Sequence, residues 1–231
     1  MTASHTRFER LWTRSFGRSD RRCAVPEGPG GRVALLDAPL RAARTHPAKG
    51  RLHALVAEEP LPARLSLADG TALIVRAAGP ADKAGARAMH QRCSPASLRL
   101  RYHGPVRDSD RHLDHLLDGR HGRSLAVTAG DGRIVALGHL MWDDGEAELA
   151  VLVEDGWQRR GLGLALLRRL AAMARAAGIG TVYAVTHASN AGLITAMRRL
   201  AVPLDFRAED GTLVITAALA GAEPAPHRPA C

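Results

Sequence analysis

The residues best suited to chemistry lie in the segment GWQRRGLGLALLRRLAAMARAAG, positions 156–178. Gly161 and Gly163 follow the polar run Gln158–Arg160 and precede an alanine- and leucine-rich stretch that predicts an amphipathic helix. The first turn of a helix leaves backbone N–H groups unpaired at the positive end of the helix dipole, and glycine lets an anion approach them. The turn is therefore a candidate phosphate site, although the glycines are also compatible with a simple tight strand-to-helix connection.

Two common nucleotide motifs do not fit this turn. A dinucleotide-binding fingerprint needs a third glycine where Leu166 stands, and a Walker A loop needs a Gly-Lys-Ser/Thr ending that is absent. The anion that the turn accepts therefore belongs to a different class of ligand.

A pair of carboxylates precedes the turn. Glu146 and Glu148 are two residues apart in GEAELAVLV, which reads as a strand, so both side chains should lie on one face. Glu148 is closer to the apolar run, where partial burial would make it a stronger base. A general base is needed for attack by an amine, because an unperturbed lysine has a pKa of ~10.4. The alternative is that both glutamates only solvate an exposed strand end.

Two other groups of reactive side chains carry less weight. Cys93 has no recognisable base beside it, so a buried structural thiol is favoured over a nucleophile. The segment DRHLDHLLDGRHG contains four candidate zinc ligands. Two of the histidines share one helical face, but no third ligand stands at a spacing typical of zinc sites, so we favour a solvated helix face and expect no metal. These ligands are His112, Asp114, His115 and His121.

Composition limits the partners. The 231-residue chain carries a formal net charge of +9, but its arginines are spread along the whole sequence and only 3% of its residues are aromatic, so we do not expect nucleic-acid binding. No stretch approaches the ~20 apolar residues of a membrane span, and the N-terminus lacks the apolar core of a secretory signal. Three widely separated cysteines suit a reducing compartment. We expect a cytoplasmic protein, monomeric or dimeric, without membrane contact.

The order of expected elements indicates one main α/β domain. We assign 1–62 to a partly disordered N-terminal extension, 63–220 to the folded domain and 221–231 to a flexible tail. Hairpins should turn at Asp69-Gly70 and at Gly130-Asp131-Gly132, with helices between them. A central strand, the helix after Gly163, the strand TVYAVT, the helix NAGLITAMRRL and a closing strand pair follow.

Three stretches carry a family resemblance. The run Gln158-Arg159-Arg160-Gly161-Leu162-Gly163 matches the Gln/Arg-x-x-Gly-x-Gly/Ala signature with which GNAT N-acetyltransferases hold the pyrophosphate of acyl-CoA. SNAGLITAMRRLAV resembles the second cofactor-contacting helix, with Asn190 at its start, and CSPASLRLRYHG resembles a helix of Pat-type protein lysine acetyltransferases. The resemblance implies a mixed, mostly antiparallel sheet of about seven strands, splayed between strands 4 and 5 and flanked by about four helices.

The same resemblance implies a site and a reaction. Acetyl-CoA would lie where the strands splay, and Glu148 matches the general base that Pat-type enzymes use to acetylate a lysine. An N–H near Ala150 to Leu152 would stabilise the charge on the thioester oxygen. Met197 stands where many relatives have a tyrosine acid, and Ala201-Val202 replaces Gly-Phe. The expected cofactor-binding residues are Leu152, Val153, Gln158, Arg159, Arg160, Gly161, Leu162, Gly163 and Asn190.

Three functions stay open on the sequence. The first is acetylation of a protein lysine, the second is acetylation of a small amine such as an antibiotic or a metabolite, and the third is acyl-CoA binding without catalysis by a regulatory module.

Overall fold

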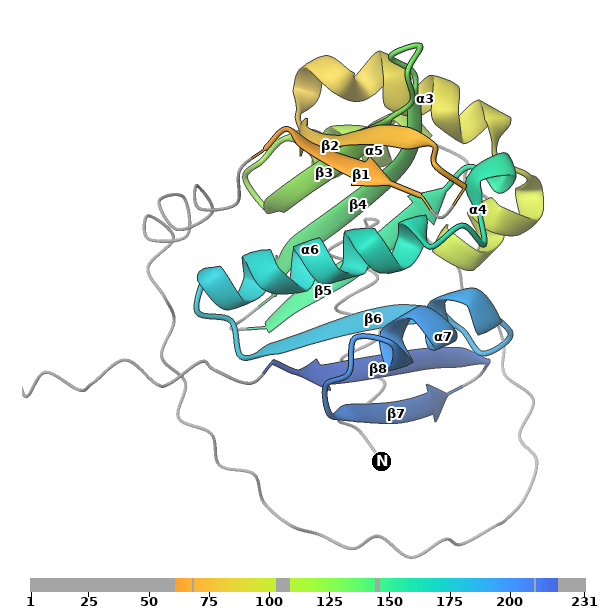
Figure 1. Ribbon diagram of the computed structural model, residues 1–231. Helices are drawn as coiled ribbons and strands as arrows, with labels where there is room; N and C mark the ends of the chain where they lie inside the picture. Colours follow the sequence, from red (N-terminus) through yellow and green to blue (C-terminus); the bar gives the residue numbers. More distant parts are fainter. Residues whose placement is uncertain (1–60, 68, 103–108, 144–145, 210, 220–231) are drawn as a thin grey trace, which may run out of the picture. The chain divides into compact units, whose positions relative to one another are not determined.

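A computed structural model describes residues 61–219, apart from 68, 103–108, 144–145 and 210. Within these ranges one eight-stranded sheet has the order β1-β2-β3-β4-β5-β6-β8-β7 (Figure 1). The strands are β1 (Ala63–Ser66), β2 (Ala72–Ala78), β3 (Gly122–Thr128), β4 (Ile134–Asp143), β5 (Glu146–Val153), β6 (Thr181–His187), β7 (Leu204–Glu209) and β8 (Thr212–Ala218). The eight strands agree with the expected sheet of about seven, and the short β1 pairs with the edge of β2 as the hairpin at Asp69-Gly70 predicts.

Both expected hairpins are confirmed. Thr71 N–H donates to Asp69 Oδ1 at 2.9 Å in the first turn, and Gly70 has a φ of +82°, which glycine adopts at little cost. In the second turn Gly132 has a φ of +81°, and β3 and β4 pair antiparallel on either side. These local signals set the register of the first half of the sheet.

The pairing changes between β5 and β6. All other neighbouring strands are antiparallel, whereas β5 and β6 run parallel and pair only at Ala147 with Val182 and at Glu148 with Tyr183. From Leu149 onward the two strands separate, since no register pair joins them within the described sheet. Counted from β2, this separation lies between the fourth and fifth strands, as the resemblance implied.

Helices cover the two faces of the sheet differently (Figure 1). On one face, α6 (Leu162–Ala176) packs on β4 and β5, while α7 (Ala191–Arg198) contacts α6 and β8. On the other, α3 (Lys83–Arg92) packs on β4 and α5 (Ser109–Leu117) on β3, and α4 (Pro95–Tyr102) contacts β5 and β6. A short 3-10 turn, η2 (Pro80–Asp82), precedes α3. A second one, η3 (Asp155–Trp157), follows β5.

The core shows which strand residues point to which face. Ala147 and Leu149 belong to the cluster that contains the buried leucines of α6, whereas Leu152 belongs to the cluster with Met89 of α3 and Leu113 of α5. Glu148, between Ala147 and Leu149, therefore points to the face covered by α3, α4 and α5.

The chain ends lie outside the described residues, except for Leu61, Pro62 and Leu219. The expected N-terminal extension and C-terminal tail are therefore not part of this description. None of the helices in the described ranges is long and apolar enough to cross a membrane.

Candidate active site

Glu148 occupies the last position at which β5 and β6 are paired. Its register partners are Met141 on β4 and Tyr183 on β6. Glu146 and Glu148 are both half-buried and share one face, as the alternation predicted. Glu148 thus lies beside the separation of the strands, while Glu146 lies two residues further from it.

Beyond Glu148 the backbone of β5 loses its partner on one side. Alternate N–H groups of a strand point to opposite edges, so those of Leu149–Val153 that point away from β4 have no strand partner in β6. Such groups are available as hydrogen-bond donors to a ligand between β5 and β6. The Glu154 N–H donates to the Val135 carbonyl on β4 at 3.0 Å, so by alternation the N–H groups that point away from β4 are those of Leu149, Val151 and Val153. Val151 lies within the range Ala150 to Leu152 that the resemblance places near the thioester.

The turn from β5 to α6 is shaped by left-handed backbone. Arg159 and Gly161 have φ values of +60° and +88°, and Gly161 is the N-cap of α6. Gly161 has no side chain with which to cap the N–H groups of the first helical turn. A Cβ at Gly161 would meet nothing within 4 Å, and one at Gly163 would lie 4.0 Å from Val153 Cγ2. The N-terminus of α6 is therefore open to an anion.

The side chain of Gln158 is exposed and bonds protein partners. Its Nε2 donates to Ser97 Oγ at 2.9 Å and to the Val153 carbonyl at 3.0 Å, and its backbone N–H donates to the Asp155 carbonyl at 3.2 Å. These bonds hold the turn to the end of β5 and to α4.

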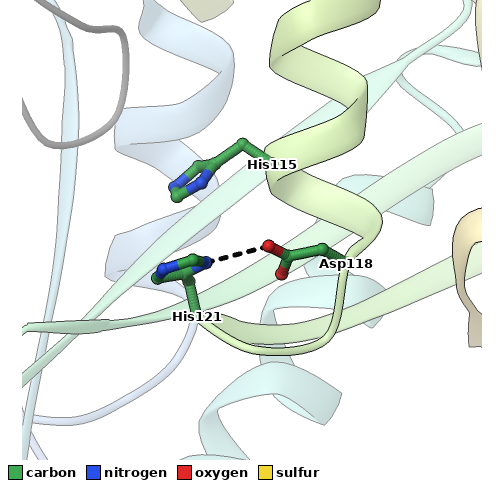
Figure 2. Close-up of side chains that lie close together, drawn as sticks. All are labelled: His115, Asp118 and His121. Carbon is green, nitrogen blue, oxygen red and sulfur yellow. Dashed lines mark hydrogen bonds and ion pairs between the residues drawn. The ribbon is translucent and has the colours of Figure 1, made fainter.

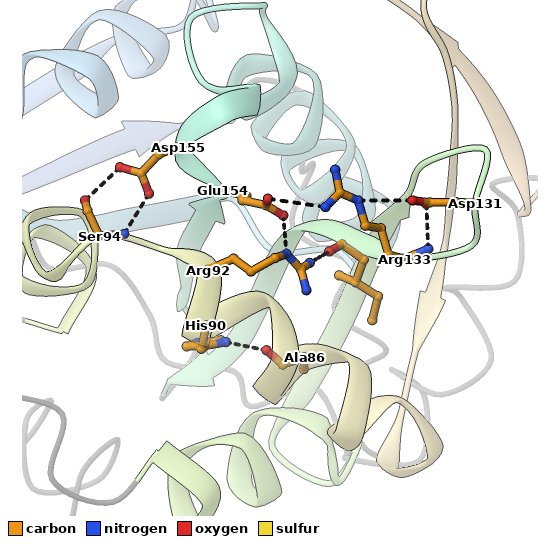
Figure 3. Close-up of polar contacts among 9 residues, drawn as sticks. Ala86, His90, Arg92, Ser94, Asp131, Arg133, Glu154 and Asp155 are labelled. Atoms are coloured by element: carbon orange, nitrogen blue, oxygen red, sulfur yellow. Dashed lines mark hydrogen bonds and ion pairs between the residues drawn. The ribbon is translucent and has the colours of Figure 1, made fainter.

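Asp155 joins the same turn to the start of α4. Its Oδ2 accepts from Ser94 N–H at 2.8 Å and its Oδ1 accepts from the Ser94 hydroxyl at 2.7 Å (Figure 3). Oδ1 also accepts from the Ser97 hydroxyl at 3.0 Å. Partial burial opposes ionisation, but these hydrogen bonds hold the pKa of Asp155 below its usual value. We call Ser94, Ser97, Asp155 and Gln158 the serine clasp. It gives a physical reason for the Ser-Pro-x-Ser stretch: these serines fix α4 against the anion-binding turn.

A second anchor lies beside the clasp. Arg92 Nε donates to Glu154 Oε2 at 3.0 Å and Arg92 Nη2 to the Ile134 carbonyl at 2.7 Å, while Arg133 lies 3.8 Å from Glu154 (Figure 3). Glu154 is buried, so two cations compensate a charge that would be costly alone. Helix α3 is thereby fixed to the end of β5.

The sequence analysis did not identify a buried polar pair on α3 and α4. His90 Nδ1 lies 2.7 Å from the Ala86 carbonyl, to which it must donate, so Nε2 accepts from the Tyr102 hydroxyl at 2.6 Å. Burial, opposed by the bond to Ala86, lowers the pKa of His90, with Arg101 adding to the effect, and burial raises the pKa of Tyr102. The pair is neutral and ties the two helices together.

His139 on β4 is the second missed residue, and its only sequence signal was a lone histidine in an apolar strand. It pairs with Ala150, so it is a diagonal neighbour of Glu148 on the same face. The Ser124 hydroxyl donates to the Leu116 carbonyl at 2.6 Å, so His139 Nδ1, 2.7 Å away, donates to Ser124. Complete burial and the nearby Arg101 hold the pKa of His139 well below its usual value. A neutral imidazole is therefore fixed near the proposed base.

Helix α7 gives Asn190 a structural role. Asn190 Oδ1 accepts from Leu193 N–H at 3.1 Å and caps the helix, and its Nδ2 donates to Thr186 Oγ1 at 2.9 Å. Met197 is fully buried in the core, so the position where relatives have a tyrosine presents no acid. Tyr183 on β6 is the register partner of Glu148, and no feature of the sequence singled it out.

The remaining candidates separate into different groups. Burial raises the pKa of Cys93 to about 12, which agrees with a protonated structural thiol. His112 lies against the Tyr102 ring and Asp114 pairs with Lys83, so neither joins the other histidines. His115 and His121, however, converge with Asp118 (Figure 2). Burial and the neighbouring His121 lower the pKa of His115.

The parallel pair that separates after Glu148, followed by an uncapped helix start, is the arrangement of an acetyltransferase fold. The model of the Acetyltransferase (GNAT) family matches residues 86–201. Acetyltransferase PA5475 of Pseudomonas aeruginosa is 32% identical over 149 residues, which cover 61% of this chain and 78% of that protein. The chain therefore belongs to the GNAT acetyltransferase family, whose members are acyltransferases that use acyl-CoA.

Solved structures agree with this assignment. The GNAT domain of PAT from S. lividans has a TM-score of 0.63 and 26% identity, with coverage of 70% of this chain and 100% of that one. Spermidine N-acetyltransferase from Vibrio cholerae, at 13% identity and a TM-score of 0.52 over 65% of this chain and 97% of its own, shares the fold alone.

Proposed function

We propose that this protein transfers an acetyl group from acetyl-CoA directly to the side-chain amine of a protein lysine, with Glu148 as the general base. The observation that carries the proposal is the position of Glu148, a half-buried carboxylate where β5 and β6 separate, on the face covered by α4. The transferase domain comprises residues 63–220.

The open start of α6 supports the choice of donor. Backbone N–H groups of residues 159–163 would hold the CoA pyrophosphate, since the Gln158 N–H donates to the Asp155 carbonyl. Val153, next to Leu152, would pair with the pantetheine arm through the edge of β5 that points away from β4. Asn190 would contribute by fixing the start of α7 beside the cofactor, since its Oδ1 and Nδ2 both bond protein partners. In two proteins of this fold, PaiA from Thermoplasma acidophilum and the Vibrio cholerae spermidine enzyme, the solved structures contain CoA.

The chemistry follows from the groups at the separation. Glu148 takes the proton of the acceptor ammonium, directly or through a water, and the amine attacks the thioester carbonyl. An unpaired N–H of β5 stabilises the negative charge on the carbonyl oxygen. The CoA thiolate then leaves without a dedicated acid, which is feasible because a thiol has a pKa of only ~8.5.

The choice of acceptor rests on α4. The serine clasp fixes this helix over Glu148, and it carries the residues that resemble Pat-type enzymes, in agreement with the likeness to the S. lividans domain. A polyamine acceptor would need acidic surroundings, but α4 carries Arg99 and Arg101 in its last turn. A small amine with a single positive charge is the second candidate.

The test is to incubate the full chain and its Glu148→Gln variant with isotopically labelled acetyl-CoA and a lysate of the host, and to separate protein from small molecules. We expect label on protein lysines that is lost with the variant. Label confined to small molecules would indicate that the acceptor is a metabolite or antibiotic amine and not a protein lysine. Binding of acetyl-CoA without any label transfer would support a regulatory module instead.

A further inference from the structure

A cluster on α5 and the loop after it lies outside the acyltransferase site. His115 is in the last turn of α5, Asp118 follows the helix, and His121 precedes β3, which gives the spacing His-x-x-Asp-x-x-His. One ligand atom from each of the three lies within 4.8 Å of the others (Figure 2). We propose that His115, Asp118 and His121 bind one Zn²⁺ ion.

The backbone around the cluster is held on both sides. The Ser124 hydroxyl bonds the Leu116 carbonyl at 2.6 Å and joins the end of α5 to β3, and Trp142 N–H donates to the His121 carbonyl at 2.8 Å. Arg123 Nη1 donates to the Gly119 carbonyl at 2.9 Å within the loop. The loop that carries Asp118 and His121 is therefore held by hydrogen bonds between the end of α5 and the start of β3, which limits the movement that binding requires.

The side chains are also partly oriented. Asp118 Oδ1 accepts from Arg120 N–H at 2.8 Å, and Asp118 Oδ2 lies 3.0 Å from His121 Nδ1. The rings of His115 and His121 have centroids 4.5 Å apart. The two imidazoles therefore lie next to each other and to the Asp118 carboxylate, with one ligand atom of each residue within 4.8 Å of the others.

The ligand set selects the ion. Two imidazole nitrogens and one carboxylate suit Zn²⁺, whereas Mg²⁺ and Ca²⁺ prefer oxygen ligands throughout. Ligand atoms of a tetrahedral zinc site are about 3.3 Å apart at Zn–N distances of ~2.0 Å, so the cluster must contract slightly. His121 is 53% exposed and has room to rotate, and a water completes the fourth position.

A bound ion would connect the end of α5 to the start of β3. Helix α5 packs on α3 and β3 on the same face of the sheet as Glu148, but none of the three ligands belongs to the anion-binding turn or to β5. The inference is thus independent of the proposed acetyl transfer and is tested without it.

The test uses the untagged full chain, freed of metal with a chelator and titrated calorimetrically with Zn²⁺. We expect one equivalent to bind, the Tm to rise by several degrees, and Co²⁺ in place of Zn²⁺ to give the strong visible absorption of a tetrahedral site. His121→Ala and Asp118→Asn should each weaken Zn²⁺ binding by at least ~10-fold. His187→Ala is the matched control, because His187 is an exposed histidine that bonds Ser189. This variant should bind Zn²⁺ with the affinity of the parent protein.

His115→Gln provides a second loss-of-ligand variant on the helix, with circular dichroism to verify its fold. The proposal is overturned if no stoichiometric Zn²⁺ binds, or if a folded His115→Gln or His121→Ala protein keeps the affinity of the parent. In the second case the ion binds at other residues of the chain.

Discussion

Glu148 and Glu146 are chemically identical side chains on one face of β5, and we propose different roles for them from their positions relative to the separation of the strands. Only Glu148 is paired with β6 at the end of the parallel stretch. Replacing it by glutamine keeps the volume and removes the base. We expect kcat to fall by about 10²- to 10⁴-fold with the dissociation constant of acetyl-CoA nearly unchanged, as measured by steady-state kinetics and calorimetry.

Glu146→Gln is the matched control and should keep kcat within about three-fold of the parent, an expectation based on its greater distance from the separation. A variant of His139 tests whether a different residue is the base. If His139→Gln lowered kcat more than Glu148→Gln did, the role of base would pass to the imidazole that Ser124 orients.

At the scale of elements, the turn between β5 and α6 combines backbone strain with open space. Gly161 has a φ of +88°, so Gly161→Ala should cost about 1–2 kcal/mol of stability. Gly163 is helical and its new methyl group would touch only Val153, so Gly163→Ala should leave the free energy of unfolding unchanged or slightly raised. We expect both variants to bind acetyl-CoA more weakly, with stability measured by urea unfolding and affinity by calorimetry.

The pair of glycine variants separates two roles of the turn. Weaker binding by a fully stable Gly163→Ala protein would mean that the added methyl group obstructs the anion. Unchanged binding by both variants would mean that the glycines serve the connection alone, and the pyrophosphate site would have to lie elsewhere.

The serine clasp couples α4 to this turn. Asp155 accepts three hydrogen bonds from Ser94 and Ser97, so Asp155→Ala should destabilise the protein by about 1–3 kcal/mol and should raise the KM of the acceptor more than that of acetyl-CoA. Asp205→Ala is the control, since Asp205 is exposed and its side chain bonds the neighbouring Arg207. Equal effects of the two substitutions on the KM of the acceptor would show that the serine clasp does not contribute to acceptor binding.

Elements marked by local signals were predictable, and long-range contacts were not. The hairpin turns and the helix after Gly163 follow from glycine placement and periodicity, whereas the separation after Glu148 was expected only through the family resemblance. Ser94 and Asp155 are 61 residues apart, and no local pattern pairs them. Asp118 was missed because α5 ends at Leu117, after which the chain turns back and places Asp118 and His121 beside His115.

At the scale of the whole molecule, buried histidines make the fold sensitive to acid. His90 and His139 have pKa values below the usual 6.5, chiefly because of burial, and Arg101 opposes protonation of both. Below pH 6.5 the unfolded chain therefore binds protons that the folded chain excludes, so stability is complete above this pH and falls as the pH decreases. The carboxylates with lowered pKa values, such as Asp155, lose their contribution only near pH 4 and below.

The expected loss is up to about 1.4 kcal/mol per pH unit for each histidine that stays neutral in the folded state. Urea unfolding at pH 7.5, 6.5 and 5.5 measures it. His139→Gln should make this pH dependence shallower even if it lowers the absolute stability, because one of the two excluded protons is gone. A parent protein equally stable at pH 5.5 and 7.5 would contradict the neutral state assigned to His90 and His139.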